Sequence, residues 1–570
     1  MKVRPYIISG LALALAPFTS QTIGSQVLNV EQTVPGSKPA AELVESFDGL
    51  GAGLSAGNPP RNPSDNSVAV GPDHIMQTVN SQIVVFTKKG KRFDTTGKVL
   101  YGPLATNTAF AGFGGVCEAR PNGDAVVRYD QLAGRWLIVM PIFRRAVDRS
   151  DGGQTGVRPG SDQGQTGVRH VFDPSLTPRL PPAAPGEAAR PGQAAQPGPA
   201  APFGPPPPLP APAPRGQGPA TTPAAPPHGS YAMCYAISAT SDPLGPYYRY
   251  AFERPLFPDY PRPAVWPDGY YTPTSTGDEV IQKHVCAVDR ARMLKGLPAT
   301  EQCVVIDGVN FLNTADVDGP ELPPSGAPNI VIAAGGTQLK NDLDDDAVFA
   351  WSFHVDWKNP SKTRIVGPQK IAVAPYHYLC GGQLTNCVPQ PGTDRRLDAQ
   401  GDKIMARLVY RRLGRRESIV AVHSVDTAAG GGGVRWYEFR LDRQRLPQLV
   451  QQGTYAPDGF FRWMASPAMD RFGNIGIGYS FGGTPNFPGQ RFAGRLADDP
   501  PGQLTLRETV LAEGEASQTN TMRWEDYSQT AVDPTDDCTI WYVGDYLKKD
   551  ATTYSTRIGA FRMPGCGLNR

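Results

Sequence analysis

Hydrophobic and polar residues alternate along most of the chain, in short runs that end at Pro-Asp, Asp-Gly or Asp-x-x-Gly. A period of two puts successive side chains on opposite faces of a β-strand, and Asp, Gly and Pro favour the turns between strands. A unit of Ala, an apolar residue, a turn with Asp and a strand recurs at 69–86, 264–275, 468–480 and 531–543. Helical periods are short, and the best helix candidate is 287–297. The pattern therefore predicts an all-β protein.

Two stretches repeat this unit most fully, "FFRWMASPAMDRFGNIGIGYS" at 460–480 and "MRWEDYSQTAVDPTDDCTIWYV" at 522–543. Each begins with Arg-Trp and continues through a turn into an alternating strand. In the first, the apolar side chains fall on one strand face, and Gly476 and Gly478 fall on the other. We expect these small residues to let backbones crowd near an axis. The recurrence is typical of a structural repeat.

Residues 143–228 differ from their surroundings. "GQTGVR" occurs twice, and a tract rich in Pro, Gly and Ala follows. This composition buries too little apolar surface to order the chain, so it predicts a disordered, locally polyproline-like insertion. It is either a surface-loop insertion or, alternatively, a binding arm or cell-wall spacer. Hairpin patterns at 125–140 and 231–252 flank it, which indicates that it interrupts one all-β run.

The repeated unit favours a single β-propeller with a disordered Pro-rich insertion. Without residues 1–60 and the insertion, roughly 420 residues remain, and four-stranded blades of about 40–50 residues then predict six to eight blades, with seven favoured. The predicted domains are a signal peptide at 1–25, an N-terminal extension at 26–60, and a propeller at 61–142 and 229–570. An array of β-sandwiches is the rival, but it would show more linker-like breaks than the one observed.

The first residues resemble a secretory signal. Lys2 and Arg4 precede an apolar run at 7–18 that is short for a membrane span. Cleavage after Ser20 or Ser25 is as plausible as cleavage after the small residues at 14–16, and an uncleaved anchor is the alternative. We expect a secreted protein, periplasmic or extracellular, without a transmembrane segment once the signal is removed.

Eight cysteines in an exported chain favour four disulfides. Eight cysteines allow 105 pairings, and nearest neighbours along the chain are the simplest choice. That choice pairs Cys117 with Cys234, Cys286 with Cys303, Cys380 with Cys387, and Cys538 with Cys566. The spacings match no zinc site. Charge is nearly balanced, with 55 Lys+Arg against 53 Asp+Glu and no basic stripe, which argues against nucleic acid as a partner.

Several stretches together resemble a family of large exported bacterial proteins, propeller-like and mostly uncharacterised. The stretches that carry the resemblance are "GDAVVRYDQLAGRWLI", "CYAISATSDPLGPYYRYAF", "PDYPRPAVWPDGYY", "AVDRARMLKG", "ARLVYRRLGRRESIVAVHSV", "VRWYEFRL" and "AVDPTDDCTIWYVGDYL". They occur in order over about residues 60–142 and 229–570, and the Pro-rich insertion departs from the pattern. The resemblance implies secretion and the propeller fold, and it implies no settled activity or catalytic residue.

Three candidate sites have simpler explanations. The carboxylates Asp342, Asp344 and Asp346 precede a strand and would suit Ca²⁺, although the spacing is not that of an EF-hand and a solvated acidic turn explains it more simply. Ser55 lies in a G-x-S-x-G match flanked by loop sequence, unlike a nucleophile elbow. His423 lies in an apolar strand, where we expect a buried, hydrogen-bonded side chain rather than a base. No cofactor is expected apart from calcium.

Polar residues in expected inner-strand positions form the main candidate site. Since these positions converge at one end of a propeller axis, several arginines there would form a cationic funnel for carboxylates or sulfates. The simpler alternative is that each arginine stacks on a neighbouring Trp and pairs with an acid to tie blades together. The candidate ligand-binding residues are Arg407, Arg411, Arg462, Arg523 and Asp526, with Glu417 and Glu525 beside them.

These observations favour a monomeric binding or interaction module at the bacterial surface or outside the cell. Its ligand on the axial face would be an anionic glycan or a protein. The alternative is an enzyme that degrades polysaccharide, a glycoside hydrolase or lyase with an Arg/carboxylate axial site built on Arg462, Arg523 and Asp526. A purely structural envelope role is the third possibility. We favour binding over catalysis.

Overall fold

A computed structural model describes residues 30–55, 61–143, 231–254, 257–276, 282–309, 311–336, 346–382 and 386–566. The predicted signal peptide and nearly all of the predicted insertion lie outside the described residues. The secondary structure of the described part is almost entirely β, as the alternating pattern predicted. Helices are short: α1 (Gly115–Ala119), α2 (Arg290–Met293) and the 3₁₀ turns η1 (Thr106–Phe110), η2 (Pro360–Lys362) and η3 (Leu379–Gly381).

In the described part of the chain, four sheets each contain four antiparallel strands. In three of them the strands follow chain order. They are β3 (Ser67–Val70), β4 (His74–Val79), β5 (Gln82–Thr87) and β6 (Val99–Ala105); β7 (Val126–Asp130), β8 (Arg135–Ile142), β9 (Tyr231–Ser238) and β10 (Tyr247–Arg254); and β11 (Ala264–Val265), β12 (Gly269–Thr276), β13 (Gln282–Asp289) and β14 (Glu301–Asp307). The fourth joins β29 (Gln529–Val532), β30 (Ile540–Tyr546) and β31 (Ser555–Arg562) to β2 (Glu42–Gly51).

A larger sheet consists of three further antiparallel sets of four strands. Parallel pairing of β15 with β21, and one parallel bridge between β23 and β25, connect the sets. The sets are β15 (Asn313–Asp318), β16 (Asn329–Ala334), β17 (Ala347–His354) and β18 (Arg364–Ala372); β21 (Leu408–Leu413), β22 (Arg416–Asp426), β23 (Gly432–Leu441) and β24 (Pro447–Tyr455); and β25 (Phe461–Met469), β26 (Ile475–Gly483), β27 (Asn486–Arg495) and β28 (Thr509–Ala512). The short β1 (Glu31–Gln32) pairs with β24, and β19 (Asn386–Gln390) pairs with β20 (Thr393–Asp398).

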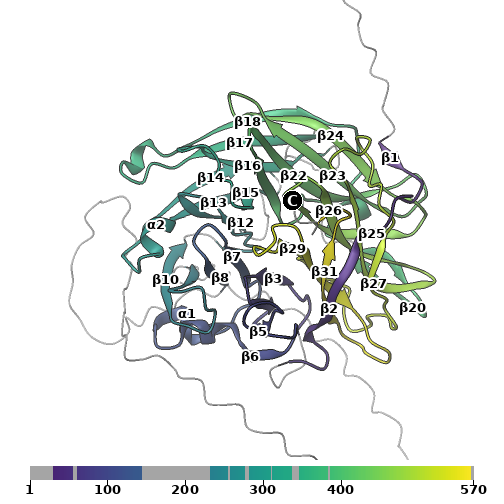
Figure 1. Cartoon of the computed structure of the whole chain (residues 1–570), viewed down its shortest axis with the longest axis horizontal. Coiled ribbons are helices and arrows are strands. Elements are labelled where there is room, and N and C mark those ends of the chain that lie inside the picture. Colours follow the sequence, from purple (N-terminus) through teal and green to yellow (C-terminus); the bar gives the residue numbers. More distant parts are fainter. Residues whose placement is uncertain are drawn as a thin grey trace, which may run out of the picture.

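The first strands of these sets contact one another in a closed cyclic order: β3, β7, β11, β15, β21, β25, β29 and again β3. Figure 1 shows the sheets arranged around a common centre. Strands that meet at an axis, with each sheet extending outward from it, are the arrangement of a β-propeller. The all-β class and a propeller-like arrangement are therefore confirmed.

The N-terminal segment closes this ring. Residues 26–60 were predicted to be an extension outside the propeller, but β2 pairs antiparallel along β31 and becomes the outer strand of the last sheet. Without β2, the edge of β31 would present unpaired backbone N–H and C=O groups. Six consecutive residues of β2 are only partly buried. The strand therefore lacks the alternation of buried and exposed side chains by which a strand is recognised in the sequence.

The two repeated stretches occupy equivalent places in neighbouring sets. The first forms β25 and β26, and the second forms the approach to β29 and then β29 and β30. The two glycines of the first stretch were expected to let backbones approach an axis. Instead, a Cβ at Gly476 would meet Phe492 and Ile540, and a Cβ at Gly478 would lie 2.3 Å from the ring of Tyr542. The glycines therefore make room for side chains, including those of β30 in the next sheet.

Apolar side chains between neighbouring sheets form the core. One cluster joins Val70 and Ile75 of the first sheet to Trp541 and Ile558 of the last, which again shows the ring closing. The hairpins predicted beside the insertion are present, and β8 pairs with β9 across it, with Leu137 opposite Ile237. No helix among the described residues is long and apolar enough to cross a membrane.

The structure contains four disulfides, and they join nearest neighbours along the chain. The pairs are Cys117–Cys234, Cys286–Cys303, Cys380–Cys387 and Cys538–Cys566. Cys286 and Cys303 lie directly opposite each other on β13 and β14. The predicted short helix at 287–297 contains α2, where the Asp289 side chain accepts a hydrogen bond from the Arg292 backbone N–H.

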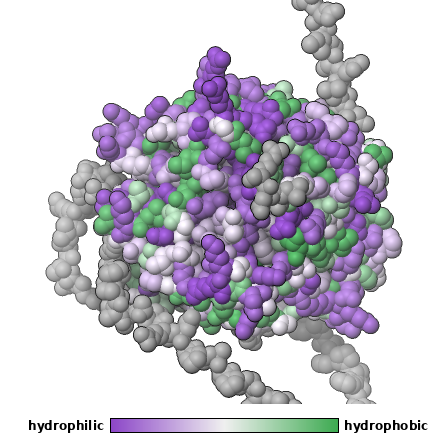
Figure 2. Space-filling model, viewed as in Figure 1, coloured by the Kyte–Doolittle hydropathy of each residue, from purple (hydrophilic) through white to green (hydrophobic). Residues whose placement is uncertain are grey.

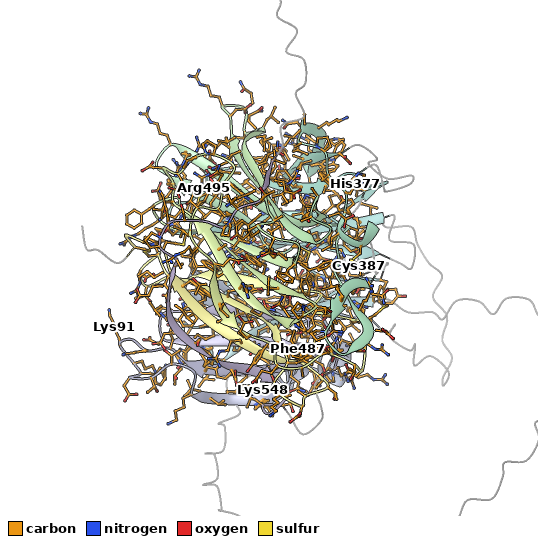
Figure 3. The ribbon with its side chains drawn as sticks, turned by 90° about the vertical axis from the view of Figure 1, so that its right-hand side faces the viewer. Lys91, His377, Cys387, Phe487, Arg495 and Lys548 are labelled. Atoms are coloured by element: carbon orange, nitrogen blue, oxygen red, sulfur yellow. A yellow bond between two sulfur atoms is a disulfide. The ribbon has the colours of Figure 1, made fainter. Side chains whose placement is uncertain are left out.

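We define the axial face as the side of the molecule on which the first strand of each set begins. Figure 3 shows the molecule edge-on: His377 and Cys387, in the segment that leads to β21, lie on the right, and Lys91 and Arg495 lie on the left. Figures 1 and 2 are viewed from the opposite face. On that opposite face, hydrophilic side chains are mixed with separate hydrophobic patches (Figure 2).

Candidate functional site

The chain segments that lead into the first strands meet on the axial face. Asp65 precedes β3, and its backbone N–H donates to the carbonyl oxygen of Glu525, which precedes β29 (2.8 Å). Asp124 precedes β7, and its Oδ2 accepts a hydrogen bond from the hydroxyl of Tyr527 (3.1 Å). Segments more than 400 residues apart in the chain are thereby held together.

Asp526 is at the middle of these contacts. Its carbonyl oxygen accepts a hydrogen bond from the hydroxyl of Tyr260 (2.6 Å), and its Oδ1 accepts one from Nε2 of Gln400 (3.1 Å). Tyr260 precedes β11, and its ring stacks on that of Tyr527 with centroids 4.3 Å apart. We call the following residues the axial cluster: Asp65, Asp124, Asp259, Tyr260, Arg262, Asp398, Lys403, Arg523, Asp526 and Tyr527.

Four members of the axial cluster have a left-handed backbone. The φ angles are 51° at Asp65, 60° at Asp124, 53° at Tyr260 and 64° at Asp526. Non-glycine residues adopt this conformation at a cost of about 1–3 kcal/mol each, and such residues concentrate at ligand-binding and active sites. The surrounding hydrogen bonds hold four strained residues at one end of the axis.

Burial and neighbouring charges raise the pKa values of four carboxyl groups of the axial cluster, those of Asp65, Asp124, Asp259 and Asp398. Burial, followed by the charges of Asp259 and Asp526, raises the pKa of Asp124 to about 8. Burial and the charge of Asp526 raise the pKa of Asp398 to about 7, and the same two causes raise the pKa of Asp259. Burial and the charges of Asp124 and Asp526 raise the pKa of Asp65 well above its ordinary range. Several of these groups therefore hold protons near neutral pH.

Two of the three cations in the axial cluster have anionic partners. Lys403 Nζ lies 2.8 Å from Asp402 Oδ1. Arg523 pairs with Asp526, and its Nε lies 3.4 Å from Asp398 Oδ2. The structure thus brings the predicted residues Arg523 and Asp526 together, and the Arg523 side chain keeps 28% of its surface exposed.

Arg262 differs from the other two cations. Its Nε and both terminal nitrogens are buried and have no hydrogen-bond partner among the described residues, and the residue is 3% exposed. Its guanidinium lies over the rings of Tyr260 (4.7 Å) and Phe311 (5.3 Å). Burial lowers its pKa, but an arginine stays charged at neutral pH. A buried charge without hydrogen bonds is costly, so this residue needs an explanation.

The axial cluster does not present a ready calcium cage. Within the described part of the chain, groups of three possible ligand atoms lying within 4.8 Å of one another occur at two places, and both include disulfide-bonded cysteines. Calcium takes six to eight oxygens at short distances. Of the predicted calcium ligands, Asp342 and Asp344 lie outside the described residues, and Asp346 accepts a hydrogen bond from the backbone N–H of Tyr376 (3.2 Å). The calcium assignment stays a prediction.

Arg407 lies at a different place from Arg523. Its Nε is 2.7 Å from Asp316 Oδ2 and its NH2 is 2.6 Å from Asp318 Oδ1. With Arg128, these residues line a central cavity formed by the ends of β3, β7, β15 and β29. Its volume of about 30 Å³ has room for water molecules and not for a sugar ring.

Arg411 and Arg462 are also paired and buried. Arg411 pairs with Asp537, and Arg462 is held by Asp458 and Glu508, each at 2.8 Å. The guanidinium of Arg462 lies over the ring of Phe481 (5.1 Å) rather than over its neighbour in the sequence. Pairing of this kind ties chain segments together, as the simpler alternative expects. Ligand binding by Arg407, Arg411 and Arg462 stays a prediction.

The side chains of three further predicted residues make hydrogen bonds inside the protein. Glu525 is buried, and its carboxylate accepts hydrogen bonds from the Ser480 hydroxyl and the Gln490 amide. Glu417 accepts one from the Tyr410 hydroxyl. His423 is buried with its Nε2 2.8 Å from the Tyr437 hydroxyl, and burial lowers its pKa well below its usual range.

Sequence reasoning missed most of the axial cluster. Asp65, Asp124 and Arg262 each lie two residues before a first strand, and Asp259 lies five residues before one. Arg523 and Asp526 were selected from the same kind of segment, six and three residues before β29. A signal existed, because "SDNSVAV", "GDAVVRY" and "PDYPRPAV" all place Asp shortly before a small residue and a strand. Selecting the charged residues shortly before the first strand of every set would have found them.

No model of a known protein family matches the chain, and no curated protein sequence matches it. Among solved structures, it is similar to a protein of unknown function from Dyadobacter fermentans, with 10% identity, a TM-score of 0.32, and coverage of 92% of this chain and 100% of that one. It is also similar to a PL25 ulvan lyase bound to -[GlcA(1-4)Rha3S]-, with 10% identity, a TM-score of 0.37, and coverage of 90% and 95%.

A third similar structure is an α-L-arabinofuranosidase from Podospora anserina in complex with cellotriose. The identity is 12% and the TM-score 0.26, and the match covers 53% of this chain and 89% of that one. Similarity at this level carries no argument about activity, so the function of this chain rests on its own residues.

Proposed function

We propose that the protein is an exported β-propeller of seven blades that binds a glycan on its axial face through the axial cluster. The seven sets of four strands are the blades, with β2 completing the last. Four disulfides support an oxidising compartment. The ligand binds where the segments leading into the blades meet, and the protein acts at the bacterial surface or outside the cell.

One observation carries this proposal: strained backbone, perturbed carboxyl groups and buried cations coincide at one end of the axis. Structural ion pairs alone do not need left-handed Asp65, Asp124, Tyr260 and Asp526. Groups with shifted pKa values that share a site with strained residues are candidates for function. Carboxyl groups and phenols are also suited to exchanging hydrogen bonds with sugar hydroxyls.

The test is a panel of neutral and acidic polysaccharides, assayed for binding by calorimetry and for chain cleavage by release of new reducing ends. We expect binding, and we expect Arg523→Gln to weaken it about tenfold or more, because the substitution removes a charge from the site. Arg557→Gln is the matched control: its side chain is 29% exposed and pairs with Asp48 away from the axial cluster. Absence of binding to every polysaccharide would refute the glycan proposal.

Catalysis is the second candidate, and Asp124 favours it. This residue is partly exposed, its pKa is raised to about 8, and its carboxylate contacts Tyr527. A carboxyl group that is protonated at neutral pH beside other carboxylates is the pattern of a general acid in glycoside hydrolysis. New reducing ends or unsaturated products that disappear in Asp124→Asn would establish the enzyme, and binding without cleavage would leave the binding module.

A further inference from the structure

Arg262 is the least satisfied charged group of the axial cluster. All three of its guanidinium nitrogens lack a hydrogen-bond partner among the described residues, although the residue is 3% exposed. Other buried guanidinium groups have hydrogen-bond acceptors: Arg462 has Asp458 and Glu508, and Arg435 has the Thr454 hydroxyl and the carbonyl oxygen of Ala374. Five N–H donors left without acceptors in a buried site cost more free energy than the two ring contacts recover.

The surrounding structure holds Arg262 in place without satisfying it. Its backbone N–H donates to the carbonyl oxygen of Pro273 (3.2 Å), and the backbone groups of Asp259 exchange two hydrogen bonds with Ser275. The segment is therefore fixed along the end of β12, and the rings of Tyr260 and Phe311 limit where the guanidinium can lie. A fixed donor set with free hydrogen-bonding capacity is a preorganised binding site.

The position also permits access. Phe311 and Asp259 are partly exposed, so the guanidinium lies within one side chain of the surface of the axial face. Burial and the charge of Asp526 raise the pKa of Asp259, so this neighbour can take up a proton when an anion approaches. The nearby acids thus need not repel an anionic ligand at mildly acidic pH.

We infer that Arg262 is the recognition residue of the axial cluster and that it binds an oxyanion, a carboxylate or a sulfate, carried by the glycan. The inference rests on the proposed function, because it names the chemical group that the same site recognises. The planar guanidinium offers paired N–H donors that match two oxygens of either group. Lys403 and Arg523 already have carboxylate partners and would contribute charge rather than free donors.

The test uses three small probes on the full purified protein at pH 6: sodium glucuronate, glucose 6-sulfate and glucose. We expect calorimetry and thermal unfolding to detect one or both oxyanions and not glucose, and the two anionic arms distinguish carboxylate from sulfate. Arg262→Met should weaken oxyanion binding about 10- to 100-fold, because charge-assisted hydrogen bonds are lost. Arg262→Lys keeps the charge without the planar donors and should bind with intermediate affinity.

Arg128→Met is the matched control. Arg128 is also a buried arginine of the axis, but it lies at the central cavity, where Asp316 keeps Arg407 as a partner after the change. We expect this variant to bind the oxyanions as the unmodified protein does. Arg262→Met should also unfold at the same or a higher temperature, since it removes an unpaired buried charge.

Two results would overturn the inference: no response to either oxyanion, or equal oxyanion binding by Arg262→Met and the unmodified protein. Failure of the proposed function has a different signature. If the probes bind through Arg262 but no polysaccharide binds, the glycan proposal falls and the oxyanion site stands. If polysaccharides bind regardless of their charge and of Arg262, the glycan proposal stands and the oxyanion inference falls.

Discussion

At the scale of single residues, the partner of a buried arginine separates structural from functional roles. Arg407 and Arg462 each contact two carboxylates, and each is held inside the propeller. Arg262 is also buried, and its guanidinium has no hydrogen-bond partner among the described residues. Removing one partner of a buried ion pair leaves the other charge unpaired, whereas removing an unpaired charge relieves the fold. The same residue type thus has opposite expected effects on stability.

The raised pKa values of the axial cluster predict how stability changes with pH. An aspartate with a raised native pKa binds its proton more tightly when folded. Its contribution to stability is therefore full below the unfolded pKa, near 4, and is lost as the pH rises through the native value. For Asp124 and Asp398 the native values are about 8 and about 7. Stability should fall between about pH 5 and pH 8.5.

Asp124→Asn tests this directly by calorimetric unfolding across that pH range. The amide cannot ionise, so the decline in Tm should be smaller by roughly 2–4 °C in the variant. Asp94→Asn, on an exposed loop, is the control and should keep the full decline. An unchanged pH profile in Asp124→Asn would mean that this carboxyl group does not hold its proton in the folded protein.

At the scale of elements, glycine positions in β26 are set by the neighbouring blade. A Cβ at Gly478 would lie 2.3 Å from the buried ring of Tyr542 on β30. The two repeated stretches therefore differ where they face each other: one contributes the gap and the other the ring that fills it.

Gly478→Ala should destabilise the protein by about 1–3 kcal/mol in equilibrium denaturation, because a packed core does not accept an extra methyl group freely. Gly90→Ala is the matched change, since a Cβ there would lie at an ordinary distance of 3.6 Å from its nearest neighbour. It should be close to neutral. Equal midpoints for the two variants would mean that the Tyr542 ring moves aside at no cost.

At the scale of the whole molecule, one N-terminal strand closes the ring. β2 pairs along β31, Leu50 is fully buried against the first and last sheets, and Phe47 packs beside it. The ring is therefore held by contacts between residues some 500 positions apart in the chain.

A chain that begins at residue 52 should lose roughly 3–6 kcal/mol of stability in urea denaturation, from the burial lost with the apolar side chains of β2. A chain that begins at residue 40 removes β1 but keeps β2, and it is the matched comparison. It should retain most of the stability. If both truncated chains unfold at the same urea concentration, β2 does not close the ring energetically.

The sequence by itself determined the local structure. The period-two pattern predicted strands, Asp, Gly and Pro marked the turns, and the repeated stretches indicated equivalent units, all of which depend on residues close together in the chain. The nearest-neighbour disulfides are present in the structure, and three of them join cysteines no more than 28 positions apart, whereas Cys117–Cys234 spans 117 positions. The positional argument selected Arg523 and Asp526, and the structure places both in the axial cluster.

Only the tertiary structure decided which charged side chains meet. Residues before a first strand look alike in the sequence, but whether an arginine there meets an acid depends on segments more than a hundred residues away, as with Arg523 and Asp398. β2 was missed because its partner is β31, at the far end of the chain. Pairing over such distances leaves no local pattern, because the contact energy belongs to both partners and neither segment encodes it alone.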